Sequence, residues 1–251
     1  MARAYQRASQ SKIGLIILAY MAFISLGMPD GLIGVAWPSI RRDFSVPLEY
    51  LGIQMFAGTT GYLLSSFFSG RVMARLGVGR LLALSCLLTG MALLGYTLVP
   101  AWALFIPLGV IGGLGAGAID AGINTYIASE HSDGLMQWLH ASYGVGVTTG
   151  PLMMTFALAN YQNWRLAYLA VGGFQVLLAL SFVISLPLWE RVPARGEAQT
   201  LPASAGAPWA STLRQRRGGG RGGFFFFFFW GGGGFWGLGF FLFSQKPGGE
   251  P

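Results

Sequence analysis

Two aspartates, Asp30 and Asp120, are the residues of this sequence best placed to do chemistry. The chain has nine acidic residues, and only these two lie inside long apolar segments. An ionised carboxylate at membrane depth is costly unless it faces a wet cavity or a partner, so such residues mark sites for protons, ions or polar solutes. The structural alternative is a carboxylate that only holds neighbouring helices together. We expect these two acids to form a proton-coupling site.

The segment around Asp30 predicts a helix with a local irregularity. Pro29 removes a backbone donor, and glycines on both sides of the acid weaken the helix. Irregular backbone at membrane depth is tolerated only where it is buried in protein or lines an aqueous cavity. Asp30 is therefore expected to face the interior of the protein.

Asp120 lies in a glycine-rich segment and has a polar neighbour on its own helix face. Asn124 follows it by four residues, so both side chains can point into one cavity. The spacing Gly27-x-x-Asp30 recurs as Gly117-x-x-Asp120, in the first and fourth apolar segments. This short echo indicates two three-helix halves with a site at their interface, an arrangement typical of transporters.

Other polar residues in the apolar segments are candidates for the same site. His140 can titrate near neutral pH and could share a proton with Asp120, although a structural hydrogen bond explains it about equally well. Neutral side chains suited to a hydroxyl-rich solute could instead bond to neighbouring helices. These neutral candidates are Gln54, Asn124, Tyr143 and Gln175.

Enzymatic chemistry has no support in the sequence. It contains no His-Glu-x-x-His motif, no nucleophile elbow and no phosphate-binding glycine loop. Two histidines and one cysteine are too few for a metal centre. We therefore expect neither catalysis, nor a cofactor, nor a metal site.

Composition indicates an integral membrane protein built from α-helices. The 251 residues are 53% hydrophobic and only 10% charged, which lies far outside the range of soluble domains. The net charge of +7 does not indicate nucleic acid, because the basic residues occupy short connections between apolar runs. Six segments of about 20 residues or more can each cross a bilayer. They are residues 13–40, 51–70, 81–99, 102–127, 139–159 and 166–188.

The distribution of basic and aromatic residues predicts the orientation. With the N-terminus in the cytoplasm, the opposite side holds only Arg41, Arg42 and Arg165, and every other lysine or arginine before residue 222 is cytoplasmic. Positive residues favour the cytoplasmic side, so we expect this orientation in the plasma (inner) membrane. Five tryptophans at span ends are expected in the headgroup region. They are Trp37, Trp102, Trp138, Trp164 and Trp189.

The two acids are expected at different depths. At 1.5 Å per residue, Asp30 lies about 27 Å from the cytoplasmic start of its span at Lys12. Asp120 lies about 15 Å from the cytoplasmic end of its span at Glu130. Such a stagger favours sequential handling of a proton over a metal site or a carboxylate dyad.

Three regions follow from the composition. Residues 1–190 are expected to form a six-helix membrane bundle. Residues 191–221, rich in Pro, Ala, Gly, Ser and Arg, are expected to be a flexible basic cytoplasmic linker. Residues 222–251 form a low-complexity Gly/Phe tail, in which 222–243 contains only Gly, Phe, Trp and Leu. Codons of G and T alone can encode all four, so a frameshift and a degenerate seventh span both explain the tail.

The connection from Gly70 to Arg80, between the second and third spans, reads Gly-Arg-Val-Met-Ala-Arg-Leu-Gly-Val-Gly-Arg. Through this motif, residues 10–190 resemble the N-terminal half of a major facilitator superfamily transporter. The connection between the second and third spans is similar to the superfamily's signature, although Ala74 stands where that signature usually has an acid. In the family this connection belongs to a charged latch that helps to hold one face of the transporter closed. The residues assigned to this conformational loop are Gly70, Arg71, Arg75, Gly77 and Arg80.

Two further segments, residues 30–38 and 138–151, resemble the fucose-permease-like branch of sugar and proton symporters. In that branch an acid in the first span and an acid in the fourth serve proton coupling and sugar binding. The resemblance implies these roles for Asp30 and Asp120. Gly146-x-x-x-Gly150-Pro151 also resembles part of the antiporter signature, which makes drug and proton antiport an alternative.

The sequence therefore predicts transport of a small polar solute, with a sugar favoured, coupled to protons and working by alternating access. Full members of the superfamily have twelve spans, which implies that this chain is a truncated half, inactive without a C-terminal half or a second copy. The alternatives are a multidrug efflux transporter and a non-transporting membrane scaffold subunit. The identity of the substrate, the direction of transport and the oligomeric state stay open.

Overall fold

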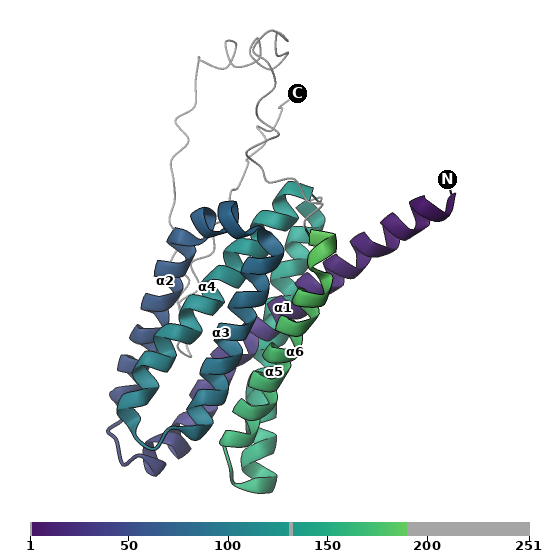
Figure 1. Ribbon diagram of the computed structural model, residues 1–251. Helices are drawn as coiled ribbons and strands as arrows, with labels where there is room; N and C mark the ends of the chain where they lie inside the picture. The colour runs from purple at the N-terminus through teal and green to yellow at the C-terminus, as the bar shows by residue number, and fades with distance from the viewer. Residues whose placement is uncertain (1, 131–132, 190–251) are drawn as a thin grey trace, which may run out of the picture. The chain divides into compact units, whose positions relative to one another are not determined.

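The computed structural model describes residues 2–130 and 133–189, and the side chains of residues 13–129 and 134–189. The described residues contain helices and no strand. The predicted linker and tail lie outside the described residues. Figure 1 shows the helices, which are α1 (Ala2–Asp43), α2 (Tyr50–Leu76), α3 (Val78–Leu98), the short η1 (Trp102–Leu104), α4 (Phe105–Glu130), α5 (Asp133–Tyr161) and α6 (Arg165–Trp189).

All six long helices are long enough to cross a bilayer, and four are also apolar enough by composition. Those four stretches are Ile13–Asp43, Val78–Leu98, Trp102–Ser129 and Arg165–Trp189. The other two, α2 and α5, have 27 and 29 residues. At 1.5 Å per residue each spans about 40 Å, more than the roughly 30 Å of a hydrocarbon core. Serines, threonines and glutamines interrupt the apolar sequence of both. The prediction of an all-α, six-helix membrane bundle is confirmed.

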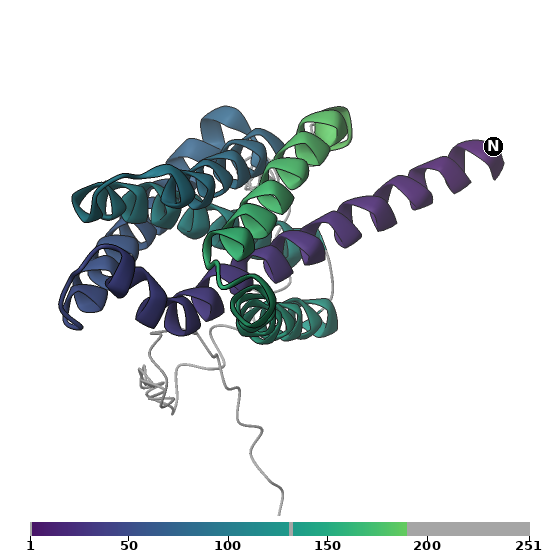
Figure 2. The same ribbon diagram turned by 90° about the horizontal axis from the view of Figure 1, so that it is seen from below.

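The helices pack mainly as three pairs, α1 with α5, α2 with α4, and α3 with α6. If α1, α2 and α3 are exchanged with α4, α5 and α6 in that order, the same three pairs result. The next contacts, α3 with α4 and α1 with α6, also exchange with one another. This is the contact pattern of an internal repeat, as the spacing of Gly27 and Gly117 predicts. Figure 2 gives a second view of these pairs.

Glycines allow the helices of two pairs to approach closely. In the α2–α4 pair, a Cβ added at Gly113 would meet the backbone carbonyl of Gly58. In the α1–α5 pair, a Cβ added at Gly146 would meet the carbonyl of Ile24. Between membrane helices, where lipid tails are as apolar as side chains, association depends on such close packing. The glycine positions therefore fix how near the polar side chains of paired helices come to one another.

Four of the five tryptophans at span ends are buried in the bundle. Trp37, Trp164 and Trp189 are 2–3% exposed, and Trp102 is 8% exposed. Trp37 and Trp102 pack edge to face, with 5.2 Å between their ring centroids. Their large apolar area fills the ends of the helix core, so these four rings pack against protein at the span ends, and their depth at the headgroups stays a prediction. Trp138 differs, with 72% of its surface exposed.

The connection between α2 and α3 is a one-residue turn. Gly77 alone separates Leu76, which ends α2, from Val78, which begins α3. Its φ of 76° is a left-handed value that favours glycine, and its N–H donates to the carbonyl of Met73. Most of the predicted loop is therefore helix. The residues assigned to it are all exposed, and they are Gly70, Arg71, Arg75, Gly77 and Arg80.

Candidate functional site

Asp30 lies on α1 and accepts a hydrogen bond from α5. The helix continues through Pro29 as one element. The hydroxyl of Tyr143 donates to Oδ2 of Asp30 at 2.6 Å, and both side chains are half-buried. We name these two residues the Asp30 pair. A hydrogen bond to a carboxylate replaces part of the hydration that the acid loses inside the bundle.

Asp120 lies on α4 and accepts two hydrogen bonds. The hydroxyl of Tyr62, on α2, donates to Oδ2 at 2.6 Å. The Nδ2 group of Asn124, one turn further along α4, donates to Oδ1 at 2.9 Å. We name Asp120 and Tyr62 the Asp120 pair. Asn124 thus lies on the face of the helix that the four-residue spacing predicts.

The two pairs belong to one polar cluster. Tyr62 interacts electrostatically with Asp30 as well as with its own partner Asp120. Tyr143 likewise interacts with Asp120 and with Tyr62 in addition to Asp30. Two acids and two tyrosines, one from each of α1, α2, α4 and α5, therefore lie within electrostatic range of one another, in a bundle where α4 contacts both α1 and α5.

The depths of the two acids are more alike than predicted. The C-terminal end of α1 at Asp43 and the start of α4 at Phe105 lie at the same end of the bundle, where both helices enter one aromatic core. Asp30 lies 13 residues before Asp43 and Asp120 lies 15 residues after Phe105, or about 20 and 22 Å. The predicted stagger is wrong because α1 ends at Asp43 and α4 begins at Phe105, each three residues later than in the predicted spans. The arrangement favours one shared site over two sequential ones.

Two of the predicted solute-binding residues connect helices elsewhere. Gln54 is buried, and its Nε2 group donates to the hydroxyl of Tyr96 on α3. Gln175 is also buried, and its Nε2 group donates to the backbone carbonyl of Ser25 on α1 at 3.3 Å. The structure does not bring either glutamine into hydrogen-bond contact with the acids. Interhelical bonding, the alternative that the sequence left open, describes their contacts.

His140 does not contact Asp120. It is exposed on α5, about one turn before Tyr143, and its ring lies edge-on to Phe23 with 6.0 Å between centroids. The oxygens of Asp120 are instead occupied by Tyr62 and Asn124. A direct proton exchange between this histidine and Asp120 has no support in the geometry.

Tyr62 is the residue of the site that the sequence analysis missed. A tyrosine in an apolar span carries little signal, because most such residues pack in helix interfaces. The repeat could have found it. The counterpart of α5 in the first half is α2, so the candidate Tyr143 predicts a tyrosine on α2, and Tyr62 is the one inside that span.

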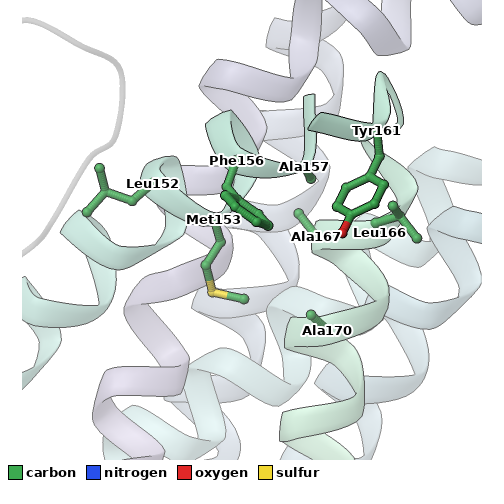
Figure 3. Close-up of a pocket in the computed structure, with 8 residues that line it drawn as sticks. All are labelled: Leu152, Met153, Phe156, Ala157, Tyr161, Leu166, Ala167 and Ala170. Atoms are coloured by element: carbon green, nitrogen blue, oxygen red, sulfur yellow. The ribbon is translucent and has the colours of Figure 1, made fainter. Parts of the chain in front are cut away.

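An apolar groove lies away from the acids. It has a volume of about 490 Å³ and runs between α5 and α6. Figure 3 shows its lining, in which Leu152, Phe156 and Leu166 present apolar side chains and Tyr161 contributes the only hydroxyl drawn. Such a lining does not supply the hydrogen bonds that a polar solute needs.

Comparison with known proteins agrees with the fold. The relatives include the glucose/mannose transporter GlcP of Bacillus subtilis (strain 168), 22% identical over 175 residues, which are 69% of this chain and 43% of the relative. An uncharacterized transporter of Buchnera aphidicola subsp. Schizaphis graminum (strain Sg) is 22% identical over 153 residues, 60% of this chain and 37% of the relative. The chain thus spans less than half the length of these curated relatives. The family model of the Major Facilitator Superfamily matches residues 15–248, and the chain belongs to this superfamily.

Proposed function

We propose that the protein transports a small polar solute, with a sugar as the leading candidate, coupled to protons and by alternating access. The observation that carries the proposal is the cluster formed by the Asp30 pair and the Asp120 pair inside the bundle. Carboxylates and tyrosine hydroxyls are suitable partners for the hydroxyl groups of a sugar. The glucose/mannose transporter among the relatives supports the same solute class.

Proton coupling follows from the charge of the cluster. Among the described side chains, every lysine and arginine lies within the first or last two turns of a helix, away from both acids. Two ionised carboxylates without a cation are costly at this depth. Protons can neutralise them, and a solute that hydrogen-bonds to the acids would change that cost. This link between protonation and solute binding is what coupled transport requires.

Alternating access needs a surface on which the bundle can rock. In transporters built from repeats, one bundle moves against another around a site at their interface. The chain spans under half of its relatives' length, so we propose that this bundle works with a second six-helix half or with a second copy, and is inactive alone.

Drug efflux is the less favoured function. It was suggested by the partial antiporter motif, but a Cβ at Gly146 or Gly150 would meet the carbonyl of Ile24 or Met28 on α1. Close packing of α1 on α5 explains both glycines without an antiport role. A scaffold subunit without transport remains the alternative class, because the tyrosines already supply both acids with hydrogen bonds.

The test is solute uptake into liposomes. The protein is expressed from its complete gene, so that any second six-helix half encoded after Arg217 is included. It is then reconstituted into liposomes with radiolabelled glucose or mannose outside. We expect uptake to rise with an inward proton gradient and to lose this dependence in Asp30→Asn and Asp120→Asn. Glu49→Gln, which removes an exposed carboxylate just before α2, is the matched control. Uptake that is independent of the proton gradient and unchanged by both substitutions would contradict the proposal.

A further inference from the structure

A glycine and an aspartate on α1 both contact one tyrosine of α5. A Cβ added at Gly27 would meet the backbone carbonyl of Tyr143. Three residues later, Asp30 accepts a hydrogen bond from the hydroxyl of the same Tyr143. Residues three apart share a helix face, one turn from each other. The glycine therefore brings the two backbones together where the short aspartate must reach the end of the tyrosine ring.

The same unit recurs on α4 and α2. A Cβ added at Gly117 would meet the backbone carbonyl of Tyr62, and Asp120 accepts the hydroxyl of the same Tyr62 at 2.6 Å. Exchanging α1 for α4 and α5 for α2 converts the first unit into the second. The repeat of the fold thus extends to four equivalent contacts, two to a backbone carbonyl and two to a hydroxyl.

We infer that Tyr62 is a positioning residue of the transport site, the counterpart of Tyr143, and that the two tyrosine–aspartate pairs form a single solute site with internal twofold symmetry. This inference rests on the proposed function and assigns a role within it. Each hydroxyl holds its aspartate in one rotamer, so that both carboxylates face the region that the four side chains share. The electrostatic interactions of Tyr62 with Asp30, and of Tyr143 with Asp120, connect the pairs.

The two pairs differ in one respect that sets their roles. Within the part of the chain that the structure describes, Asp120 accepts hydrogen bonds at both carboxylate oxygens, from Tyr62 and Asn124, whereas Asp30 accepts one, at Oδ2. The second oxygen of Asp30 has no donor among the described side chains, so it is the acceptor that a solute hydroxyl would meet. Asp120 is held from two sides and is the more fixed of the two acids.

The test compares three Tyr→Phe substitutions, each of which removes one hydroxyl and keeps the ring. Tyr62→Phe and Tyr143→Phe remove the hydrogen bonds to the two acids. Tyr20→Phe is the matched control, because its hydroxyl also joins α1 to α5, by donating to the carbonyl of Leu135 at 2.8 Å, without contacting either acid. A merely structural tyrosine would behave like this control.

The first readout is the pH profile and KM of solute uptake by the protein in liposomes. Loss of a hydrogen bond to a charged group predicts a KM about 10-fold higher in Tyr62→Phe and in Tyr143→Phe. The midpoint of the pH profile should move by about one unit to higher pH, since the ionised acid loses a donor. The double variant should cost less than the product of the single effects, because groups within one site are not additive.

The second readout does not require transport. Infrared titration of carboxyl bands, assigned with Asp30→Asn and Asp120→Asn, should show that Tyr62→Phe moves the Asp120 band and that Tyr143→Phe moves the Asp30 band. If both carboxyl bands of the Tyr62→Phe variant titrate at the same pH as in the unmodified protein, the inference is overturned. If Tyr62→Phe leaves coupled uptake unchanged, the inference is overturned and the proposed function stands. If the protein expressed from its complete gene takes up no solute while the bands still shift, only the proposed function is rejected.

Discussion

Gly117→Ala tests how the bundle positions its acids. Gly117 lies on α4 against α2, and an added Cβ would fall well inside van der Waals contact with the carbonyl of Tyr62 and 2.9 Å from Oγ of Ser66. Ordinary Cβ contacts are 3.4–4 Å, so the backbones must separate by about 1 Å. That movement carries Tyr62 away from Asp120, to which it donates at 2.6 Å.

The magnitude follows from two opposing effects. Overpacking a closely fitted interface costs about 1–3 kcal/mol, whereas replacing a helical glycine by alanine contributes about 1 kcal/mol of stability. Gly144→Ala on α5 is the matched control, because nothing lies within 4 Å of a Cβ added there. It gains the helix preference without the overpacking, so the two variants should differ by about 1–3 kcal/mol.

The assay is thermal unfolding of the purified protein in detergent, followed by solute uptake. A difference of this size corresponds to several °C in Tm, roughly 2–4 °C per kcal/mol for a chain of this length. Gly117→Ala should also raise KM, because Tyr62 no longer reaches its acid. Equal Tm values and equal KM values for the two alanine variants would refute the argument that glycine contacts position the acids.

Other predictions concern contacts outside the acid cluster. Asp43 accepts hydrogen bonds from the buried indole of Trp164 and from the guanidinium of Arg165, each at 2.9 Å. Asp43→Ala should lower stability by about 1–3 kcal/mol, because it leaves that indole N–H without its acceptor. Arg165→Gln should cost less than about 1 kcal/mol, because its ion pair is more than a third exposed. Thermal unfolding of both variants measures the difference. Gln175→Leu loses a 3.3 Å hydrogen bond to Ser25, and it also removes a buried oxygen that has no partner in the described residues. We therefore expect the free energy of unfolding to stay within about 1 kcal/mol of the unmodified protein and KM to be unchanged. A 10-fold rise in KM would instead place this glutamine in the solute site.

The sequence predicts the acids and the bundle because each has a local physical signature. A carboxylate in an apolar run is rare enough to identify Asp30 and Asp120 by itself. Apolar length and the echo between the two Gly-x-x-Asp motifs indicate six helices in two related halves. The contacts of α1 with α5 and of α2 with α4 agree with this division.

What the sequence does not predict depends on which helices pair. Tyr62 contacts Asp120 because α2 lies against α4. Hydropathy carries no information about that neighbour, and the repeat is the one signal that could have found it. The same limit explains the tryptophans. Trp37 and Trp102 stand at span ends, as they would in a headgroup belt, but packing between helix ends buries both. The depth of Asp30 was misjudged because apolar length does not locate the end of α1.

Proton movement driven by the solute is the most direct test of the central claim, that the acid and tyrosine cluster couples protons to solute. The protein, expressed from its complete gene as for the uptake test, is reconstituted in liposomes that enclose a pH-sensitive dye. There is no initial pH gradient, and glucose or mannose is added outside. The account predicts that the lumen acidifies as the sugar enters and that Asp30→Asn abolishes this acidification. Entry of the sugar with no change of internal pH would contradict the account.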